Sequence, residues 1–287
     1  MRLATWNVNS IRTRVVRTVE FAVRENIDVL AMQEIKCKPE QFPYGPFEDA
    51  GYHVEVHGLN QWNGVAIASR APMSDVRTAF DGMPGFAKAT ATAPAHIGLD
   101  APLEARALGA VIDGVRVWSL YVPNGRSLDD PHLDYKLQWL DALRTATAAE
   151  LAAAPDLPLA LVGDFNIIPF DDDNGDPDIV VGRSTHVSPA ERDAFFALES
   201  AGVHDVVRPL LPGGYTYWDY QRLKFPRNEG IRIDFVLGSR ALGDAVSGAS
   251  IHRDERKGEQ PSDHVPVVVD LDLGGAEDDD DMPMIFA

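Results

Sequence analysis

The sequence predicts a single α/β domain, a four-layer sandwich in which two packed, mixed or antiparallel β-sheets lie between outer helices. Three observations favour this fold class. Short apolar runs of strand length recur along the chain, helix-like segments lie between several of them, and an Asp-Gly pair at 113–114 joins two runs as a hairpin. Because no linker divides the chain, we expect one domain at 1–273 followed by an acidic, disordered tail at 274–287.

The first half of the chain is predicted from hydrophobic periodicity and turn residues. In order, we expect a strand at 3–9, a helix to about residue 25, a strand at 27–34, a turn and strand at 62–70, an exposed loop at 85–103, and hairpin strands at 108–112 and 115–122. The loop is predicted because its many Ala, Pro and Thr residues show little periodicity.

The second half is organised around one apolar run at 159–166, which ends in Asp164 and Asn166. Pro158 before this run and Pro169 after it favour a buried strand over a buried helix. The other expected elements are a helix at 132–154, an acidic loop at 170–190, a helix at 189–201, a basic loop between 218 and 231, and strands at 231–237 and 265–271. The acidic loop has either a solvated face, which we favour, or some metal affinity.

Composition limits location and partners. The formal net charge is −18, and removing the five acids at 277–281 still leaves −13. A phosphate-binding site therefore needs a local basic surface, or a metal ion that offsets the acids. Cys37 is the only cysteine, so no intrachain disulfide can form and a reducing cytoplasm is expected. Strand-like sequence begins at Leu3 and no run reaches about 18 apolar residues, so we expect neither a signal peptide nor a membrane partner.

Polar side chains follow the apolar strands at one end. Asp164 and Asn166 are two residues apart, so on a strand they share a face. A single Asp-x-Asn triplet is most often a loop-capping turn, but this arrangement recurs. The other polar strand ends are Asn7, Glu34, Tyr121 with Asn124, Asp234, and Asp263 with His264. The recurrence predicts that several strands end at one common pocket.

The residue types of this pocket indicate its chemistry. Carboxylate and carboxamide oxygens without a cysteine partner favour Mg²⁺, with Mn²⁺ as a substitute, over zinc. The chain has neither a Gly-x-x-x-x-Gly-Lys-Ser/Thr loop nor a Gly-x-Ser-x-Gly elbow, so nucleotide-driven transfer and acyl-transfer hydrolysis lack support. Metal-assisted phosphoester hydrolysis is the reaction that remains.

Seven short motifs, in order, carry a resemblance to a known family. They are Trp-Asn-Val-Asn-Ser-Ile-Arg at 6–12, Gln-Glu at 33–34, Asn-Gly-Val-Ala at 63–66, Tyr-Val-Pro-Asn-Gly at 121–125, Gly-Asp-Phe-Asn at 163–166, Arg-Ile-Asp-Phe at 232–235 and Ser-Asp-His at 262–264. The chain resembles the exonuclease III family of abasic-site endonucleases, within the endonuclease/exonuclease/phosphatase superfamily, over residues 1–273. This resemblance implies a DNase I-like fold and a Mg²⁺-dependent repair nuclease that cuts 5′ to abasic sites and leaves a 3′-hydroxyl. It also implies 3′–5′ exonuclease and 3′-phosphatase work.

The resemblance further implies roles for single residues. The implied metal ligands are Glu34, as the principal one, and Asn9, Asp263, Asp164 and Asn166. The implied catalytic residues are Asp164, Asn166, His264, Asp234, Tyr121 and Asn7. In this scheme Asp164 would orient or deprotonate the attacking water, and Asp234 would set the tautomer and charge of His264 beside the phosphate. Tyr121 and Asn124 would bond the scissile phosphate or the leaving group.

The implied partner is duplex DNA with abasic sites or blocked 3′ ends, bound by a monomer. The residues expected to grip its phosphates, without reading sequence, are Arg12, Arg17, Asn124, Arg126, Arg222, Lys224, Arg227 and Arg232. Tyr217 and Trp218, with Ile231 and Ile233, would wall a pocket for a flipped-out sugar that carries no base. Some family members carry a tryptophan where this chain has Ile231, so the balance between abasic incision and 3′-end processing stays open.

The histidines outside the motifs and the single cysteine are not expected to take part in catalysis. His53, His57 and His186 are expected on the surface, and Cys37 in the core or a loop. One alternative is a catalytically silent relative that binds nucleic acid or protein, against which the intact acidic and His264 motifs count. The other is a phosphatase or phosphodiesterase for lipid or inositol substrates, against which the basic loop and the absence of a membrane-facing apolar segment count.

Overall fold

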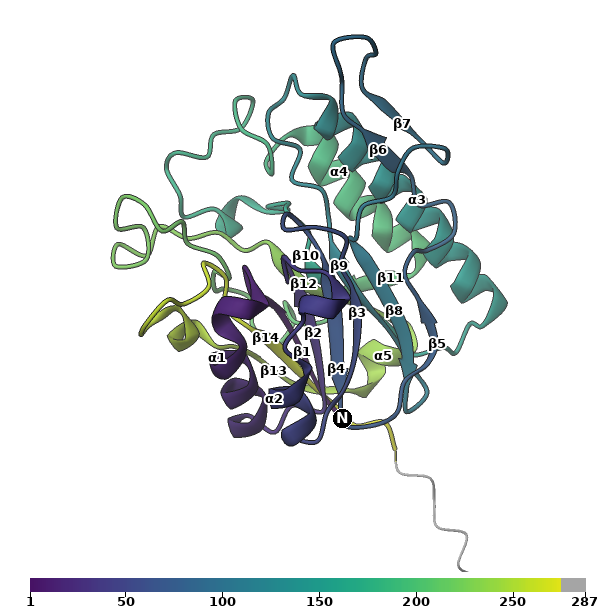
Figure 1. The fold of residues 1–287 in the computed structure, drawn as a ribbon, viewed down its shortest axis with the longest axis vertical. Helices are drawn as coiled ribbons and strands as arrows, with labels where there is room; N and C mark the ends of the chain where they lie inside the picture. The colour runs from purple at the N-terminus through teal and green to yellow at the C-terminus, as the bar shows by residue number, and fades with distance from the viewer. Residues whose placement is uncertain (275–287) are drawn as a thin grey trace, which may run out of the picture.

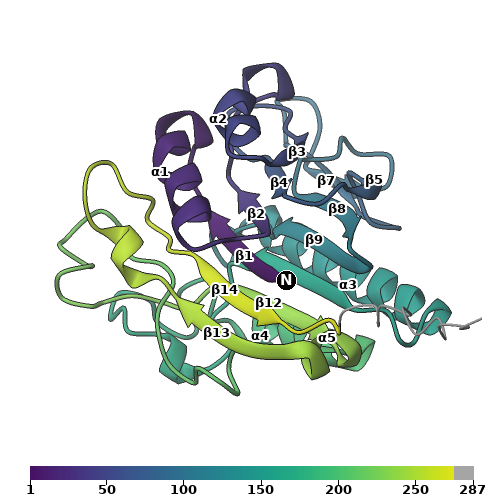
Figure 2. The same cartoon turned by 90° about the horizontal axis from the view of Figure 1, so that it is seen from below.

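The computed structural model describes residues 1–274, so the tail predicted at 274–287 lies, except for Gly274, outside the described residues. The described chain forms two six-stranded sheets that pack face to face, with helices on both outer faces (Figures 1 and 2). The predicted fold class is confirmed.

Each sheet is built from strands that lie far apart in the sequence. The first has the order β13 (Val246–Ile251), β14 (Val267–Leu271), β1 (Arg2–Asn7), β2 (Val29–Gln33), β4 (Val65–Ser69) and β3 (His53–His57). The second has the order β11 (Val203–Asp205), β12 (Asp234–Ser239), β10 (Leu159–Asp164), β9 (Val115–Tyr121), β8 (Ala107–Ile112) and β5 (Ser74–Arg77).

The centre of each sheet is a parallel pair of strands. β1 runs parallel to β2, and β10 runs parallel to β9, while the strands that flank these pairs are antiparallel to them. In register, Asn7 faces Gln33 in the first sheet, and Asp164 faces Tyr121 in the second. The carboxyl ends of the four central strands therefore meet at one edge of the sandwich.

The alternation of side chains along the strands explains which groups reach this edge. Between the sheets, a buried cluster includes Leu3 of β1 together with Ala160 and Val162 of β10. Two residues beyond Val162 on the same face is Asp164, and Asn7 continues the face of Leu3 in the same way. Both polar groups thus lie at the mouth of the apolar layer between the sheets.

In the described part of the chain, five α-helices cover the outer faces and ends of the sheets. They are α1 (Ile11–Arg24), α2 (Tyr44–Asp49), α3 (Pro131–Ala153), α4 (Pro189–Ala197) and α5 (Arg240–Ala245). The apolar sides of α1 and α2 bury Phe21 and Phe47 against the first sheet, and α3 buries Trp139 against the second. The described 3₁₀ helices are η1 (Pro39–Gln41), η2 (Asp171–Asp173), η3 (Leu198–Ala201) and η4 (Arg253–Arg256).

The starts of α3 and α4 follow from local sequence. Asp130 caps α3 by accepting a hydrogen bond from the backbone N–H of His132 (2.9 Å). Ser188 and Glu191 form a reciprocal capping box at α4, and a proline follows the cap in both helices. These caps place the first turns of α3 and α4 beside the edge at which the central strands end.

Two predicted segments are different in the structure. Residues 85–103 are not an irregular loop, because β6 (Gly85–Ala87) and β7 (His96–Gly98) pair as a ribbon whose Phe86 packs on His132 of α3. The acidic segment 170–190 is only partly solvated, since Asp173 and Asp176 are buried. Within the described residues, no helix combines the length and the apolar character that a membrane span requires.

Candidate active site

A cavity of about 420 Å³ opens where the central strands end. The polar strand ends that line it are Glu34, Tyr121, Asn124, Asp164, Asn166, Asp263 and His264. Asn7 and Asp234 lie directly behind this lining, bonded to Asp164 and His264 respectively. The fold thus gathers into one site side chains that are more than 200 residues apart in sequence.

Asn7 joins the two carboxylates at the centre of the site. Its Nδ2 donates to Glu34 Oε1 and to Asp164 Oδ2, both at 2.9 Å. The second oxygen of Asp164 accepts the backbone N–H of Asn166 at 2.9 Å. Both Asn7 and Asp164 are buried at the sheet edge. These bonds hold the carboxylate of Asp164 in one orientation toward the cavity.

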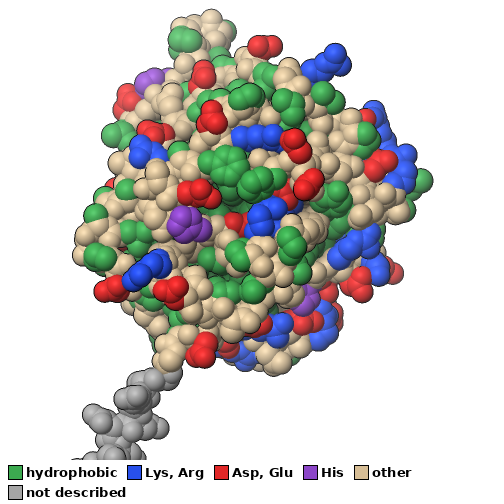
Figure 3. Space-filling view, turned by 180° about the vertical axis from the view of Figure 1, so that it is seen from behind, with side chains coloured by type: hydrophobic (Ala, Val, Ile, Leu, Met, Phe, Trp, Pro, Cys, Tyr) green, Lys and Arg blue, Asp and Glu red, His purple; other side chains and the backbone are tan. Residues whose placement is uncertain are grey.

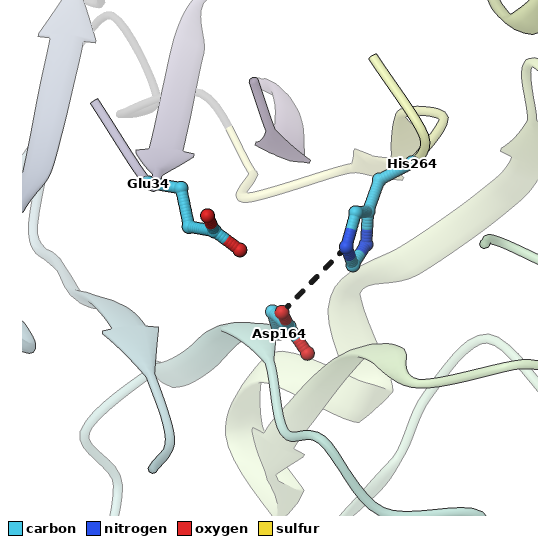
Figure 4. Close-up of side chains that lie close together, drawn as sticks. All are labelled: Glu34, Asp164 and His264. Carbon is cyan, nitrogen blue, oxygen red and sulfur yellow. Dashed lines mark ion pairs between the residues drawn. The ribbon is translucent and has the colours of Figure 1, made fainter. Parts of the chain in front are cut away.

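Glu34, Asp164 and His264 converge on a common point (Figure 4). One ligand atom from each of the three lies within 4.8 Å of the other two. Burial raises the pKa of Glu34, but Lys36, Asn7 and His264 lower it by more, so the carboxylate is ionised at neutral pH. The two carboxylates could hold a divalent cation, with His264 beside it.

His264 is held as a cation between acids. Its Nδ1 lies 2.9 Å from Asp234 Oδ2, and its Nε2 lies 3.8 Å from Asp164 Oδ2. Burial lowers the pKa of His264, but the charges of Asp234, Asp164 and Asp263 outweigh it and raise the pKa to about 10. The imidazolium therefore directs a charged N–H at the cavity, where a phosphate oxygen could accept it.

Asp164 has the opposite balance of forces. Burial, followed by the nearby charges of Asp234 and Glu34, raises its pKa to about 7 even though His264 acts to lower it. A carboxylate whose pKa lies near the working pH is suited to take a proton from water.

The cavity lining also contains a group that sequence reasoning misplaced. His186, expected on the surface, lines the cavity. Its Nε2 lies 3.1 Å from Asn166 Oδ1 and 3.2 Å from Asn124 Nδ2, and Asn124 Nδ2 donates to Asn166 Oδ1 at 3.0 Å. Burial and then Lys136 lower the pKa of His186 to about 4, so the ring is neutral. The sequence feature that could have indicated a position inside the fold is that His186 lies two residues before Ser188, the N-cap of α4.

Tyr121 lines the cavity beside Glu34 and is a hydrogen-bond donor. Burial, followed by the charge of Glu34, raises the pKa of Tyr121 well above its usual range, so the phenol stays protonated. The guanidinium of Arg106 stacks 4.8 Å from the ring centroid and fixes its plane.

The backbone around the site is unusually strained. Positive φ angles occur at Asn9 (42°), Glu34 (51°), Lys36 (53°), Asn166 (52°) and His186 (74°). Non-glycine residues adopt this region at a cost and concentrate there at functional sites. At Asn9 and Asn166 the chain turns just after β1 and β10 end, so neither residue continues its strand.

Lys36 is a second group that sequence reasoning missed. Its Nζ lies 2.7 Å from Glu34 Oε2 and donates to Asn9 Oδ1 at 2.5 Å. The expected metal ligand Asn9 therefore has its amide oxygen bonded to Lys36, and its Nδ2 donates to Asp263 Oδ1 at 2.9 Å. Asn166 is also engaged, through Asn124 and through its donation to the carbonyl of Val122 at 3.0 Å. The sequence feature that could have indicated a role for Lys36 is its position two residues after Glu34, the acid at the end of its strand.

The predicted basic loop is largely neutralised, and Lys224, expected to bind phosphate, has internal acidic partners. Lys224 is buried, and its Nζ lies 2.5 Å from Asp176, 2.7 Å from Asp178 and 3.4 Å from Glu229. The ammonium is thus held by the acidic segment that was expected to be solvated.

Other predicted phosphate contacts have internal partners as well. Arg232 is buried and bonds Asp205 (3.1 Å), and Arg17 bonds the carboxylate and the carbonyl of Glu255. Arg222 and Arg227 are exposed but pair with Asp178 and Glu229 at 2.9 and 2.8 Å. Arg12 is exposed, and Arg126 is exposed with only a 4.0 Å pair to Asp130. On the face drawn in Figure 3, Lys and Arg side chains alternate with Asp and Glu side chains.

The apolar wall of the cavity differs from the predicted one at one residue. Tyr217, Ile231 and Ile233 line it as expected, joined by Ile179. Trp218 does not line it, because its ring is buried edge-on against Phe225 at 5.2 Å, on the far side of the chain. Tyr217 packs edge-on against His264, with 4.9 Å between the ring centroids. Cys37 is buried, as expected, and free.

The sequence is similar to those of known proteins over most of its length. Residues 4–264 match the Endonuclease/Exonuclease/phosphatase family. Exodeoxyribonuclease III of Haemophilus influenzae is 30% identical over 278 residues, which cover 93% of this chain and 98% of that protein.

Two solved structures resemble the whole described fold. The 3′ phosphatase NExo from Neisseria, bound to a product DNA hairpin, superposes with a TM-score of 0.83 and 34% identity, covering 95% of this chain and 99% of that one. An AP endonuclease from Archaeoglobus fulgidus superposes with a TM-score of 0.83 and 31% identity, at the same coverage of each chain.

Proposed function

The chain belongs to the endonuclease/exonuclease/phosphatase family as a hydrolytic nuclease similar to exonuclease III, and we propose that it is a Mg²⁺-dependent DNA-repair nuclease. Its substrates are duplex DNA with abasic sites, cut on the 5′ side, and duplex ends with blocked 3′ termini. The observation that carries this proposal is the convergence of Glu34, Asp164 and His264, linked by Asn7, at one edge of the sandwich.

The residues at the site fit a divalent metal. Six carboxylates line the cavity against three cationic side chains, Arg222, Lys224 and His264, and each of the three is already paired with an acid. A phosphodiester would be repelled from such a cavity unless a cation offset the acids. Glu34 would hold the metal principally, with Asp164 beside it, and hard carboxylate oxygens favour Mg²⁺ or Mn²⁺. When bound, the metal polarises the phosphate and stabilises the leaving 3′-oxygen.

The protein's own groups handle the water and the phosphate. Asp164, oriented by Asn7 and by the N–H of Asn166, takes a proton from the attacking water. His264, kept charged by Asp234, donates from Nε2 to a non-bridging phosphate oxygen. Tyr121 and Asn124 line the same cavity and would donate hydrogen bonds toward the phosphate or the leaving oxygen. Together these donors surround the negative charge that develops during in-line attack.

The apolar wall supports a sugar without a base as the extruded group. Tyr217, Ile231 and Ile233 present apolar surface, and a nucleotide that lacks its base costs less to extrude from the duplex. Arg12 and Arg126 are the exposed basic residues best placed to grip the flanking phosphates. The site is complete within one chain, which supports action as a monomer, and the buried, free Cys37 supports a reducing, cytoplasmic location.

The experiment uses two duplex substrates, one with a single internal tetrahydrofuran abasic analogue and one with a 3′-terminal phosphate. Each is incubated with the purified protein in Mg²⁺ and in EDTA, beside the Asp164→Asn variant. We expect Mg²⁺-dependent incision 5′ to the analogue and release of the 3′-phosphate, both abolished by EDTA and by the substitution. If the protein processes neither substrate in Mg²⁺, the proposal is wrong.

A further inference from the structure

A buried ion pair that takes no direct part in the proposed chemistry lies behind the cavity. Lys136 of α3 and Glu191 of α4 are fully buried, with 2.5 Å between Nζ and Oε1. Neither residue lines the cavity. Replacing a buried ion pair with apolar residues is often neutral or stabilising, so the stability of the fold does not by itself explain such a pair.

The contacts of Lys136 reach two loops of the site. Its Nζ donates to the backbone carbonyl of Asn166 at 2.7 Å and, more weakly, to that of Asn124 at 3.5 Å. These loops follow β10 and β9, and they present the side chains of Asn166 and Asn124 to the cavity. One ammonium therefore holds the backbone beneath both carboxamides.

The contacts of Glu191 reach a third loop. Its Oε1 accepts the backbone N–H of His186 at 2.9 Å, and its Oε2 accepts the hydroxyl of Ser188 at 2.6 Å. Burial raises the pKa of Glu191, but Lys136, Ser188 and the N–H of His186 lower it by more, so the carboxylate is charged. The His186 loop is thus bonded to the same ion pair as the loops of Asn124 and Asn166.

The three loops meet again on the cavity side. The side chains of Asn124, Asn166 and His186 lie within 3.0 to 3.2 Å of one another. We propose that the Lys136–Glu191 pair is a positioning device that fixes the backbone of these three loops, and so sets the donors that face the phosphate or leaving group. This inference rests on the proposed nuclease function.

A merely structural clasp between α3 and α4 is the competing explanation, and the chain offers a matched control. Arg116, at the other end of β9 from Tyr121, is also buried under α3 and bonds the carboxylates of Glu150 and Asp75 as well as a backbone carbonyl. Its Nε donates to Glu150 at 3.1 Å, and its Nη1 donates to the carbonyl of Asp75 at 3.0 Å. Arg116→Met removes a comparable buried cation far from the cavity.

The experiment compares Lys136→Met with Arg116→Met well below the melting temperature of either, with folding verified by circular dichroism. We expect Lys136→Met to lower kcat on the abasic duplex about 100-fold, as for a displacement of about 1 Å in a catalytic group. KM should change less than kcat, because the other proposed DNA contacts, Arg12 and the apolar wall, lie outside these loops. Arg116→Met should keep kcat within about twofold of the wild type at a similar loss of Tm. Equal kcat in the two variants would overturn the inference.

Two further measurements keep the test decisive if Lys136→Met does not fold. Glu191→Gln keeps the shape of the side chain, and we expect the same selective loss of kcat. Hydrogen exchange should show faster exchange of the His186 amide and of the loops at 122–126 and 165–168 in this variant, and not in Arg116→Met. Because exchange does not depend on turnover, unchanged exchange in Glu191→Gln refutes the positioning role even if the wild type has another activity.

Discussion

The charge of His264 offers the sharpest test of the site. Asp234→Asn removes the negative charge at 2.9 Å from Nδ1 and keeps an amide oxygen that can accept the same hydrogen bond. The substitution therefore separates the electrostatic role of Asp234 from its role in orienting the ring. Asp234→Ala, which removes both, is the companion variant.

The structure sets the expected magnitude. A pKa of about 10 against an ordinary 6.5 corresponds to roughly 5 kcal/mol of preference for the imidazolium, at about 1.4 kcal/mol per pKa unit. Asp234 contributes the most of the three carboxylates that raise this pKa. We assign it about 2–3 kcal/mol, so loss of the charged donor should cost roughly a hundredfold in kcat.

The sign of the pH dependence follows from the same argument. His264 in the wild type stays protonated up to about pH 10, whereas its pKa falls in Asp234→Asn, and the donor loses its charge as pH rises. The deficit of the variant should therefore be small near pH 6 and large near pH 8 to 9. In the wild type, Asp164 must be deprotonated to act as the base, so activity should be lost as pH falls and this carboxylate takes up a proton. Mg²⁺ beside Asp164 should lower its pKa below the metal-free value of about 7.

The assay is single-turnover incision of the abasic duplex in Mg²⁺ from pH 5.5 to 9, combined with NMR titration of the His264 ring in the wild type and in both variants. Asp234→Ala should be less active than Asp234→Asn at every pH, because the ring also loses its orientation. If Asp234→Asn keeps wild-type kcat at pH 8, or if the pKa of His264 does not fall, the electrostatic reasoning is wrong.

Three other predictions concern separate parts of the site. Asp164→Asn should lower kcat by about 10³-fold or more, because it removes the base. It should leave DNA affinity, measured by fluorescence anisotropy, nearly unchanged, because Asp164 is not among the proposed DNA contacts; weakened binding of the same size would contradict this. Glu34→Ala should weaken Mg²⁺ binding, measured by calorimetry, and regain part of its activity at high Mn²⁺; unchanged metal affinity would place the cation elsewhere. Arg126→Ala should reduce the slope of log DNA affinity against log salt concentration by about one. Lys224→Met should leave that slope unchanged and lower Tm, because Lys224 already has three carboxylate partners. The reverse pattern would identify Lys224 as a phosphate contact.

Strands and the chemistry of their ends could be predicted from local sequence. Apolar runs such as 159–166 carry their own signal, and the polar group at the end of each run is visible in the chain. Hydrogen bonds within the structure then join groups such as Asn7 and Asp164, which periodicity alone could not pair. The ribbon at 85–103 was missed because its two strands have only three residues each and little alternation.

The ion-pair partners of the basic residues could not be predicted, because the sequence does not show which acid will lie next to a given Lys or Arg. Lys224 and Arg232 look like exposed phosphate contacts among the loops, yet Asp176 and Asp205, which lie 48 and 27 residues away, bind them inside the protein. Trp218 was misplaced for a related reason, because neighbouring residues in an extended segment face opposite ways and only packing decides which side is the cavity.

The sequence by itself determined the fold class and the family, because alternation, turn residues and ordered motifs are local properties of the chain. Tertiary structure alone decided which charges face the cavity, that Lys36 and His186 belong to the site, and that Lys136 and Glu191 lie behind it. The physical reason is that the ionisation and reach of a side chain depend on burial and on neighbours brought from distant segments, and those distances exist only after the two sheets have packed.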